Sequence, residues 1–165
     1  MTARSLRFSI RAAQPEDGAA VTAMTAALAR HDRLPRPSFD AEAFRRDGFG
    51  ERRAFEALVA ETPEQGLVGY ALWFWVYDAL EGRRGGYMED LYVAPEARRA
   101  GVGRALMAAA ARDIEAHGGR FLAWNAKTLN AEGNAFYAIL GERGGDLVNW
   151  SCDGERFAML AKQAE

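Results

Sequence analysis

A loop rich in arginine and glycine precedes an alanine-rich stretch with helical spacing. The loop reads RRAGVGR from Arg98 onward. The first turn of a helix carries amide donors without intrahelical partners and the positive end of the helix dipole, so it binds anions. Gly101 and Gly103 keep side chains away from that backbone, while Arg99 and Arg104 add positive charge beside Arg98. The loop is therefore predicted to bind a phosphate or pyrophosphate group.

Two common phosphate-binding motifs are not found in this loop. The chain contains no GxxxxGK[ST] sequence, which argues against a nucleotide-hydrolysing P-loop. The dinucleotide fingerprint GxGxxG also fails, because Leu106 stands three positions after Gly103 and the segment from Val93 to Gly101 is too long for the tight turn. The loop taken alone leaves a second interpretation open, in which Gly101 only begins a helix and the arginines are solvated surface charge.

Two adjacent acids, Glu89 and Asp90, lie in the apolar stretch YMEDLYV. Neighbours on a regular strand face opposite sides, so only one of them can point into a cleft. If the preceding hairpin pairs Tyr77 with Tyr87, Glu89 lies opposite Trp75, on a face with flat apolar walls suited to an aliphatic amine. We expect Glu89 to bind the amine and to act as a base through water. A bulge would change the parity, so the choice between the two acids stays open.

Other polar residues have simpler explanations. Asp78 is a candidate secondary anion, as Asp90 is, but an ion pair with Arg83 or Arg84 is the favoured interpretation for Asp78. His117 precedes a double glycine at a predicted helix end, where a cationic side chain is stabilising by itself. Cys152 has no partner in the sequence that would activate its thiol.

The elements that must position these residues follow from hydrophobic periodicity. Strands are predicted at 6–11, 55–61, 67–77, 87–93 and 120–124. Helices are predicted at 15–30, 40–46, 101–119 and 130–141, and a final hairpin from LVNW and ERFAMLA around CDGE. Gly48 and Gly50 are expected to turn the chain out of the second helix. The 67–77 strand is apolar on both faces, which predicts a central strand. The order indicates an α/β fold, a mixed sheet with helices on both faces.

Length and composition exclude several classes of protein. With 165 residues the chain is predicted to form one domain over 1–165. A net charge of −2, from 21 basic and 23 acidic residues, predicts no binding to nucleic acid or to anionic membranes. One cysteine and no clustered His/Cys spacing predict neither a disulfide nor a metal site. No secretory signal or membrane span is recognised, so a cytoplasmic protein is expected.

The loop and its surroundings resemble a known family. R-x-x-G-x-G after a strand and a VAPE turn resembles the acetyl-CoA loop of the GNAT superfamily of N-acetyltransferases. The segments DGFGE, LVAE, YD, EDLYV and N-x5-FY occur in the order and spacing of the diamine acetyltransferase branch, and the resemblance covers residues 5–160. It implies the GNAT fold, acetyl-CoA as cosubstrate and direct acetyl transfer to an amine without an acyl-enzyme.

The resemblance also implies roles for individual residues. Amides of Arg99–Arg104 would hold the pyrophosphate, the pantetheine arm would lie beside Leu91–Val93 like an added strand, and the thioester oxygen would meet an amide near Leu91. Asn130 would contact the pantetheine arm, and Tyr137 would protonate the sulfur, although a core aromatic beside Phe136 remains the alternative for Tyr137. The residues implied to bind acetyl-CoA are Leu91, Tyr92, Val93, Arg98, Arg99, Ala100, Gly101, Val102, Gly103, Arg104, Asn130 and Tyr137. The predicted catalytic residues are Tyr137 and Glu89, and the predicted substrate-binding residues are Glu89, Asp90, Asp78 and Trp75.

The implied acceptor is a primary amine of a small molecule: a diamine, a polyamine or a lysine-like amine. Leu147 and Val148 stand where the family carries acids before the tryptophan, which weakens the case for a long polyamine. A homodimer is also implied. The alternatives are acetylation of a protein amino terminus or lysine, which the loops predicted at 31–50 and 78–86 disfavour, and a non-catalytic CoA-binding sensor.

Overall fold

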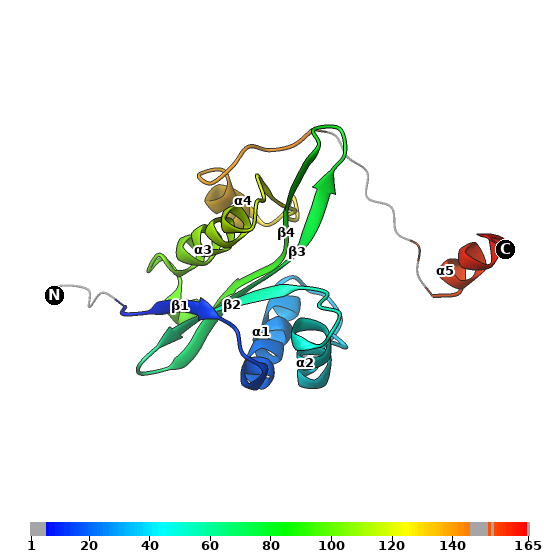
Figure 1. Cartoon of the computed structure of the whole chain (residues 1–165). Helices are drawn as coiled ribbons and strands as arrows, with labels where there is room; N and C mark the ends of the chain where they lie inside the picture. Colours follow the sequence, from blue (N-terminus) through cyan, green and yellow to red (C-terminus); the bar gives the residue numbers. More distant parts are fainter. Residues whose placement is uncertain (1–5, 146–151, 153, 165) are drawn as a thin grey trace. The chain divides into compact units, whose positions relative to one another are not determined.

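A computed structural model describes residues 6–145, 152 and 154–164, which divide into two compact units, 1–125 and 126–165 (Figure 1). The strands are β1 Ser9–Ala12, β2 Glu56–Thr62, β3 Gly66–Asp78, β4 Arg83–Val93 and β5 Leu122–Trp124. The α-helices are α1 Gly18–His31, α2 Ala41–Phe49, α3 Val102–Ala116, α4 Ala131–Tyr137 and α5 Gly154–Ala161. Short 3-10 helices are η1 Pro15–Asp17, η2 Pro95–Ala97 and η3 Lys162–Ala164.

The first unit is built on one sheet of five strands in the order β1-β2-β3-β4-β5. Neighbouring strands are antiparallel except for β4 and β5, which are parallel and joined through α3. β3 lies at the centre, and its residues Val68–Trp73 are all buried. The predictions of a mixed sheet and of a central 67–77 strand are therefore confirmed.

Helices cover both faces of this sheet. Two neighbouring residues of β3 show the division, because consecutive strand residues point to opposite faces. A side chain at Gly69 would meet Val102 and Leu106 of α3, whereas Tyr70 packs in a buried cluster with Val21 and other residues of α1 and α2. Figure 1 shows the same arrangement, with α3 on one side of the sheet and α1 and α2 on the other.

Two predicted boundaries are wrong. The second helix runs to Phe49, so Gly48 lies inside it rather than in the turn. A side chain on Gly48 would stand 2.7 Å from the Phe55 ring, so the glycine allows close packing. The loop predicted at 78–86 is mostly strand, because β3 and β4 continue to Asp78 and from Arg83. The segment at 78–86 therefore gives little support for a small-molecule acceptor over a protein acceptor.

The predicted last strand is also wrong. ERFAMLA lies in α5 rather than in a hairpin. Five of the residue types in this segment, Glu, Arg, Met, Leu and Ala, are strong helix formers, which favours the helix over a strand. Phe157 and Met159 are exposed. LVNW lies outside the described residues.

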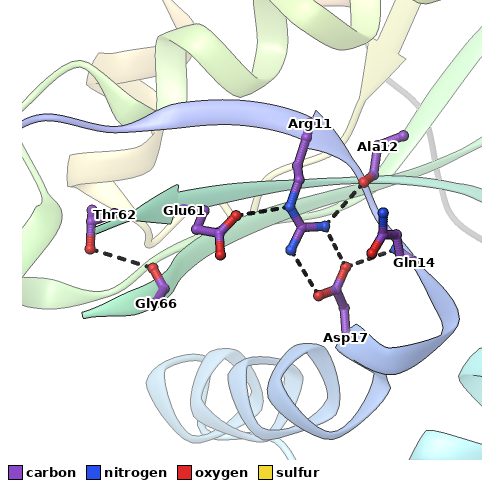
Figure 2. A network of polar contacts seen from close by, with 7 residues as sticks. All are labelled: Arg11, Ala12, Gln14, Asp17, Glu61, Thr62 and Gly66. Carbon is purple, nitrogen blue, oxygen red and sulfur yellow. Dashed lines mark hydrogen bonds and ion pairs between the residues drawn. The ribbon is translucent and has the colours of Figure 1, made fainter. Parts of the chain in front are cut away.

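An arginine in β1 ties three elements of the first unit together (Figure 2). The Arg11 guanidinium makes a bidentate contact with Asp17 of η1, at 2.7 and 3.0 Å. Its Nε donates to Glu61 of β2 at 2.9 Å. Asp17 also accepts the backbone N–H of Gln14. The ion pair therefore fixes how the chain leaves the sheet to begin α1.

Candidate active site

The start of α3 offers amide donors that no side chain caps. Its N-cap is Gly101, with a left-handed φ of +89°, and no side chain accepts a hydrogen bond from the first turn among the described residues. The first backbone hydrogen bond of the helix runs from Ala105 to Gly101. Nothing lies within 4 Å of the position that a Gly101 side chain would take, so the backbone conformation is what requires glycine there. The first turn can therefore accept an anion.

The arginines before α3 differ in what they do. The Arg98 Nε donates to the carbonyl of Val93 at 3.0 Å, so this side chain fastens the loop to the end of β4. Arg99 is exposed, and its backbone has a left-handed φ of +61°. Arg104 is exposed on the first turn of α3. Of the three arginines, Arg99 and Arg104 present their charge to solvent, whereas Arg98 holds the loop in place.

One edge of β4 has no strand beside it over half of its length. β5 pairs with β4 only from Gly86 to Met88. From Glu89 to Val93, no described strand pairs with that edge of β4. Backbone amides and carbonyls along such an edge can pair with an extended ligand, as in the addition of a strand to a sheet. This edge ends just before the loop that leads into α3.

A β-bulge interrupts β4 where this edge begins. Leu72 pairs with Asp90, but the next residue, Trp73, pairs with Met88, which leaves Glu89 as the extra residue. The predicted pairing of Tyr77 with Tyr87 is therefore wrong. Because Leu72 and Trp73 point to opposite faces, Met88 and Asp90 do as well, and the bulge reverses the parity that a regular strand would give.

Asp90 is held by a partly buried chain of hydroxyl groups that the sequence analysis missed. The Tyr70 hydroxyl donates to Asp90 Oδ2 at 2.8 Å. The Thr25 hydroxyl of α1 lies 2.8 Å from the Tyr70 hydroxyl. One signal was available, because Tyr70 is a phenol inside an apolar strand and a buried phenol needs a hydrogen-bond partner.

Burial and like charge act on both carboxylates at the bulge. Burial raises the pKa of Asp90, the Tyr70 hydrogen bond partly offsets this rise, and the charge of Asp32 adds to it. The pKa of Glu89 is also raised, first by partial desolvation and then by the charge of Asp90. Both groups would therefore be stabilised in their charged form by a cation such as an ammonium group.

Two predicted substrate residues are engaged elsewhere. Trp75 pairs with Gly86, and the Arg84 guanidinium lies 4.0 Å from the centroid of the Trp75 ring. This pairing puts Trp75 on the sheet face that α3 covers, so it is not opposite Glu89. Asp78 Oδ1 accepts two backbone N–H groups of the hairpin turn, and its Oδ2 lies 3.4 Å from Arg83. The ion pair that was the favoured interpretation for Asp78 is confirmed.

The second unit contains Asn130 and Tyr137. Asn130 is the N-cap of α4, and its side-chain oxygen accepts the N–H of Gly133 at 2.9 Å. Tyr137 is the last residue of α4, is half-buried, and packs its ring against Phe136 at 5.3 Å between centroids. The roles of Asn130 and Tyr137 toward acetyl-CoA stay predictions.

Two cavities are lined by neither the acids of the bulge nor the first turn of α3. One of about 200 Å³ is lined by Arg53, Ala54, Phe55, Glu56, Phe74 and Trp75. Another of about 520 Å³ lies beside the ends of β1 and β2 and includes Arg7 and Thr62. In the described part of the chain, no helix is long and apolar enough to cross a membrane, and no cluster of three metal-ligating side chains occurs.

The sheet, the bulge and the helix start together define a class of protein. The Acetyltransferase (GNAT) family profile matches residues 22–141, most of the chain. The chain belongs to the GNAT acetyltransferase family, whose members use acetyl-CoA as cosubstrate. The predicted family is therefore confirmed.

Curated relatives are similar over parts of their length. The thialysine N-epsilon-acetyltransferase of Mus musculus is 34% identical over 135 residues, which cover 73% of this chain and 78% of that protein. The Sus scrofa enzyme of the same name is 39% identical over 102 residues, which cover 57% of this chain and 59% of that protein. The latter match thus leaves two fifths of the relative uncovered.

Solved structures share the fold. An integron cassette protein from V. cholerae is 22% identical with a TM-score of 0.77, and the match covers 97% of this chain and 99% of that one. A ribosomal-protein-alanine N-acetyltransferase from Brucella melitensis is 22% identical with a TM-score of 0.71, covering 90% and 100%. At this identity the likeness concerns the fold alone.

Proposed function

We propose that this protein transfers the acetyl group of acetyl-CoA directly to the primary amine of a small, lysine-like molecule. The observation that carries the proposal is the edge of β4 over Glu89–Val93, with which no described strand pairs and which runs from the acidic bulge to the loop before α3. An extended pantetheine arm suits that edge. A diphosphate suits the uncapped first turn of α3.

The main chain does most of the proposed cosubstrate binding. Leu91–Val93 offer backbone groups to the pantetheine arm, and Arg99–Arg104 offer amides to the pyrophosphate. Arg99 and Arg104 add charge, while Arg98 holds the loop against the strand. Asn130 is proposed to contact the pantetheine arm with the amide nitrogen of its side chain, since the oxygen caps α4.

The proposed chemistry has three tasks. Glu89 removes one proton from the ammonium group through water, while Asp90 holds the positive charge in place. A backbone amide near Leu91 donates to the oxygen that becomes negative as the N–C bond forms. Tyr137 gives its proton to the sulfur as the C–S bond breaks, and it recovers the second proton of the amine. No nucleophilic cysteine takes part.

The acceptor class rests on the relatives and on one departure from the family. The relatives named above act on thialysine, an analogue of lysine with a side-chain primary amine. Leu147 and Val148 stand where the family resemblance implies acids, and the loss of those negative charges weakens the case for a long polyamine. We therefore favour a lysine-like amino acid over a polyamine. A cytoplasmic setting and a homodimer remain part of the proposal.

A CoA-release assay with purified protein tests this function. The acceptor panel holds thialysine, lysine, putrescine, spermidine, an aminoglycoside and a peptide with a free amino terminus. Glu89→Ala and Tyr137→Phe are each expected to lower kcat by about 10²-fold or more, the usual contribution of a general base or acid. Glu81→Gln, an exposed acid in the β3–β4 turn, is the matched control and should keep the wild-type rate.

The same assay separates the alternatives. Turnover of the peptide alone would point to a protein acetyltransferase. Calorimetric binding of acetyl-CoA without turnover of any amine would favour a sensor. Wild-type rates in both variants would reject the roles of Glu89 and Tyr137.

A further inference from the structure

We propose that Tyr70 is a positioning residue, held by Thr25, that fixes the Asp90 carboxylate for the acceptor amine. This inference rests on the proposed function, because it gives Asp90 the ammonium group as its ligand. Tyr70 lies on β3, Thr25 on α1 and Asp90 on β4, so three elements meet in one chain of hydrogen bonds.

The direction of each hydrogen bond follows from counting protons. An ionised carboxylate can only accept hydrogen bonds, so the Tyr70 hydroxyl donates its single proton to Asp90 at 2.8 Å. The Tyr70 oxygen can then only accept from Thr25, whose single hydroxyl proton lies between this oxygen at 2.8 Å and the backbone carbonyl of Val21 at 3.1 Å. The hydrogen bonds therefore all point in one direction, from Thr25 on the helix through the Tyr70 phenol to the Asp90 carboxylate.

Tyr70 is well placed to hold the Asp90 carboxylate in one orientation. Its side chain is 0% exposed and packs in the apolar cluster between the sheet, α1 and α2. A phenylalanine would fill that space equally well, so packing alone does not account for the hydroxyl. The hydroxyl contacts Oδ2 of Asp90, and no described residue makes a hydrogen bond to Oδ1. One oxygen is thereby held and the other is left for a ligand.

The charged groups around Asp90 favour a cation there. Asp32 at the end of α1 and Glu89 on β4 are both acidic, and Tyr70 on β3 is neutral. A protonated amine would relieve the repulsion among these carboxylates. A carboxylate that turned freely would lose this advantage, because the amine must also meet the thioester at a fixed angle.

Kinetics of Tyr70→Phe tests the role, since this change removes one oxygen atom and keeps the ring. We expect KM for the amine to rise roughly tenfold or more, the usual effect of losing a hydrogen bond to a charged group. KM for acetyl-CoA should stay within about twofold. Thr25→Val should raise the amine KM by about threefold, since it acts on Asp90 only through Tyr70.

Thr22→Val is the matched control. Thr22 lies one turn earlier on α1 and its hydroxyl donates to the backbone carbonyl of Gly18 at 2.8 Å, without a contact to Tyr70. It should leave both KM values unchanged. A carbon-13 NMR titration of the Asp90 carboxyl gives a readout independent of activity. In Tyr70→Phe its pKa should rise, because the hydroxyl that stabilises the charged form is lost.

An unchanged amine KM in a folded Tyr70→Phe protein overturns the proposal. A parallel rise in both KM values would do so too, because it would indicate general damage to the core. If the wild-type protein acetylates no amine, the proposed function fails separately. In that event the positioning of an amine fails with it, and the Asp90 titration then decides only whether Tyr70 stabilises the Asp90 carboxylate: a raised pKa in Tyr70→Phe supports this and an unchanged one excludes it.

Discussion

Glu89 and Asp90 are neighbours in the sequence but have different surroundings. Asp90 is half-buried and accepts a hydrogen bond from Tyr70, whereas Glu89 is the exposed extra residue of the bulge. Adjacent carboxylates in different environments can perform different tasks. The proposed division, in which Asp90 holds the ammonium group and Glu89 accepts a proton, rests on this difference.

This division predicts a pH effect. Glu89 acts as a base only when ionised, so kcat/KM falls as pH drops through its raised pKa. Asp90→Asn removes one of the two causes of that raised pKa. We expect the acid limb of the profile to move to lower pH, on top of a lower overall rate. Glu81→Gln should leave the limb in place, and a shift to higher pH in Asp90→Asn would contradict the assignment.

The Arg11 ion pair predicts an effect on stability. The Arg11 side chain is 31% exposed and that of Asp17 is 11% exposed. Arg11→Ala leaves the Asp17 carboxylate without its bidentate partner, and we expect a loss of about 1–3 kcal/mol in the free energy of unfolding. Arg46→Ala is the control, because the Arg46–Asp47 pair is 65% and 37% exposed and solvent screening should leave it with little effect on stability.

The pH dependence of stability gives the same interaction a second test. Hydrogen bonds from Arg11 lower the pKa of Asp17 in the folded protein. The stability from this pair is therefore present above the ordinary pKa of an aspartate, near 4. It is lost as the pH falls through the lowered value. Urea unfolding of wild type and Arg11→Ala should differ most at neutral pH and converge in acid. A constant difference would exclude Asp17 as the partner that matters.

At the scale of elements, β4 and the start of α3 contribute consecutive parts of the proposed site. The bulge at Glu89 sets the direction of Asp90, and the edge of β4 with which no described strand pairs begins there. The loop after β4, which the hydrogen bond from Arg98 to Val93 holds in place, then leads into the first turn of α3. The two ends of α3 both depend on glycines with a left-handed backbone, Gly101 at +89° and Gly118 at +81°. Only the first of them borders the proposed anion site.

These glycines form a matched pair for mutation. Gly101→Ala and Gly118→Ala each put a side chain on a left-handed backbone, at a cost of about 1–2 kcal/mol. Neither side chain would meet an atom within 4 Å, so the strain is comparable. We expect similar losses in thermal stability, but only Gly101→Ala should weaken CoA binding measured by calorimetry, by roughly tenfold. Equal CoA affinities in the two variants would place the diphosphate elsewhere.

At the scale of the whole molecule, the second unit carries several large exposed apolar side chains. Large exposed hydrophobic residues after Asn125 are Leu129, Ile139, Phe157, Met159 and Leu160. The family resemblance implies a homodimer, and burial of such side chains between copies would stabilise one. This remains a prediction about the assembled protein.

Light scattering coupled to size-exclusion chromatography tests the dimer. We expect a mass twice that of the chain, and a shift toward the monomer in Phe157→Glu. Leu80→Glu is the control, because Leu80 lies in the β3–β4 turn and is already 99% exposed. A monomeric wild-type protein at high concentration would remove the homodimer from the proposal.

The sequence predicted the elements of the first unit well. Every strand and helix before Asn125 occurs near its expected place, because each shows a clear hydrophobic period or a glycine or proline boundary. The glycine-dependent start of α3 and the family were also visible, since both depend on local motifs. The strand predicted for ERFAMLA was wrong because a pattern of seven residues is too short to separate a strand from a helix.

What the sequence determined by itself was the order of elements, the glycine-dependent helix start and the presence of two adjacent acids. Only the tertiary structure decided which face of the sheet Asp90 occupies. One extra residue in β4 reverses the direction of every side chain beyond it, and this depends on pairing with β3 rather than on local spacing. The Thr25–Tyr70–Asp90 chain was likewise hidden, because it joins residues 45 and 20 positions apart that meet only when the helix packs on the sheet.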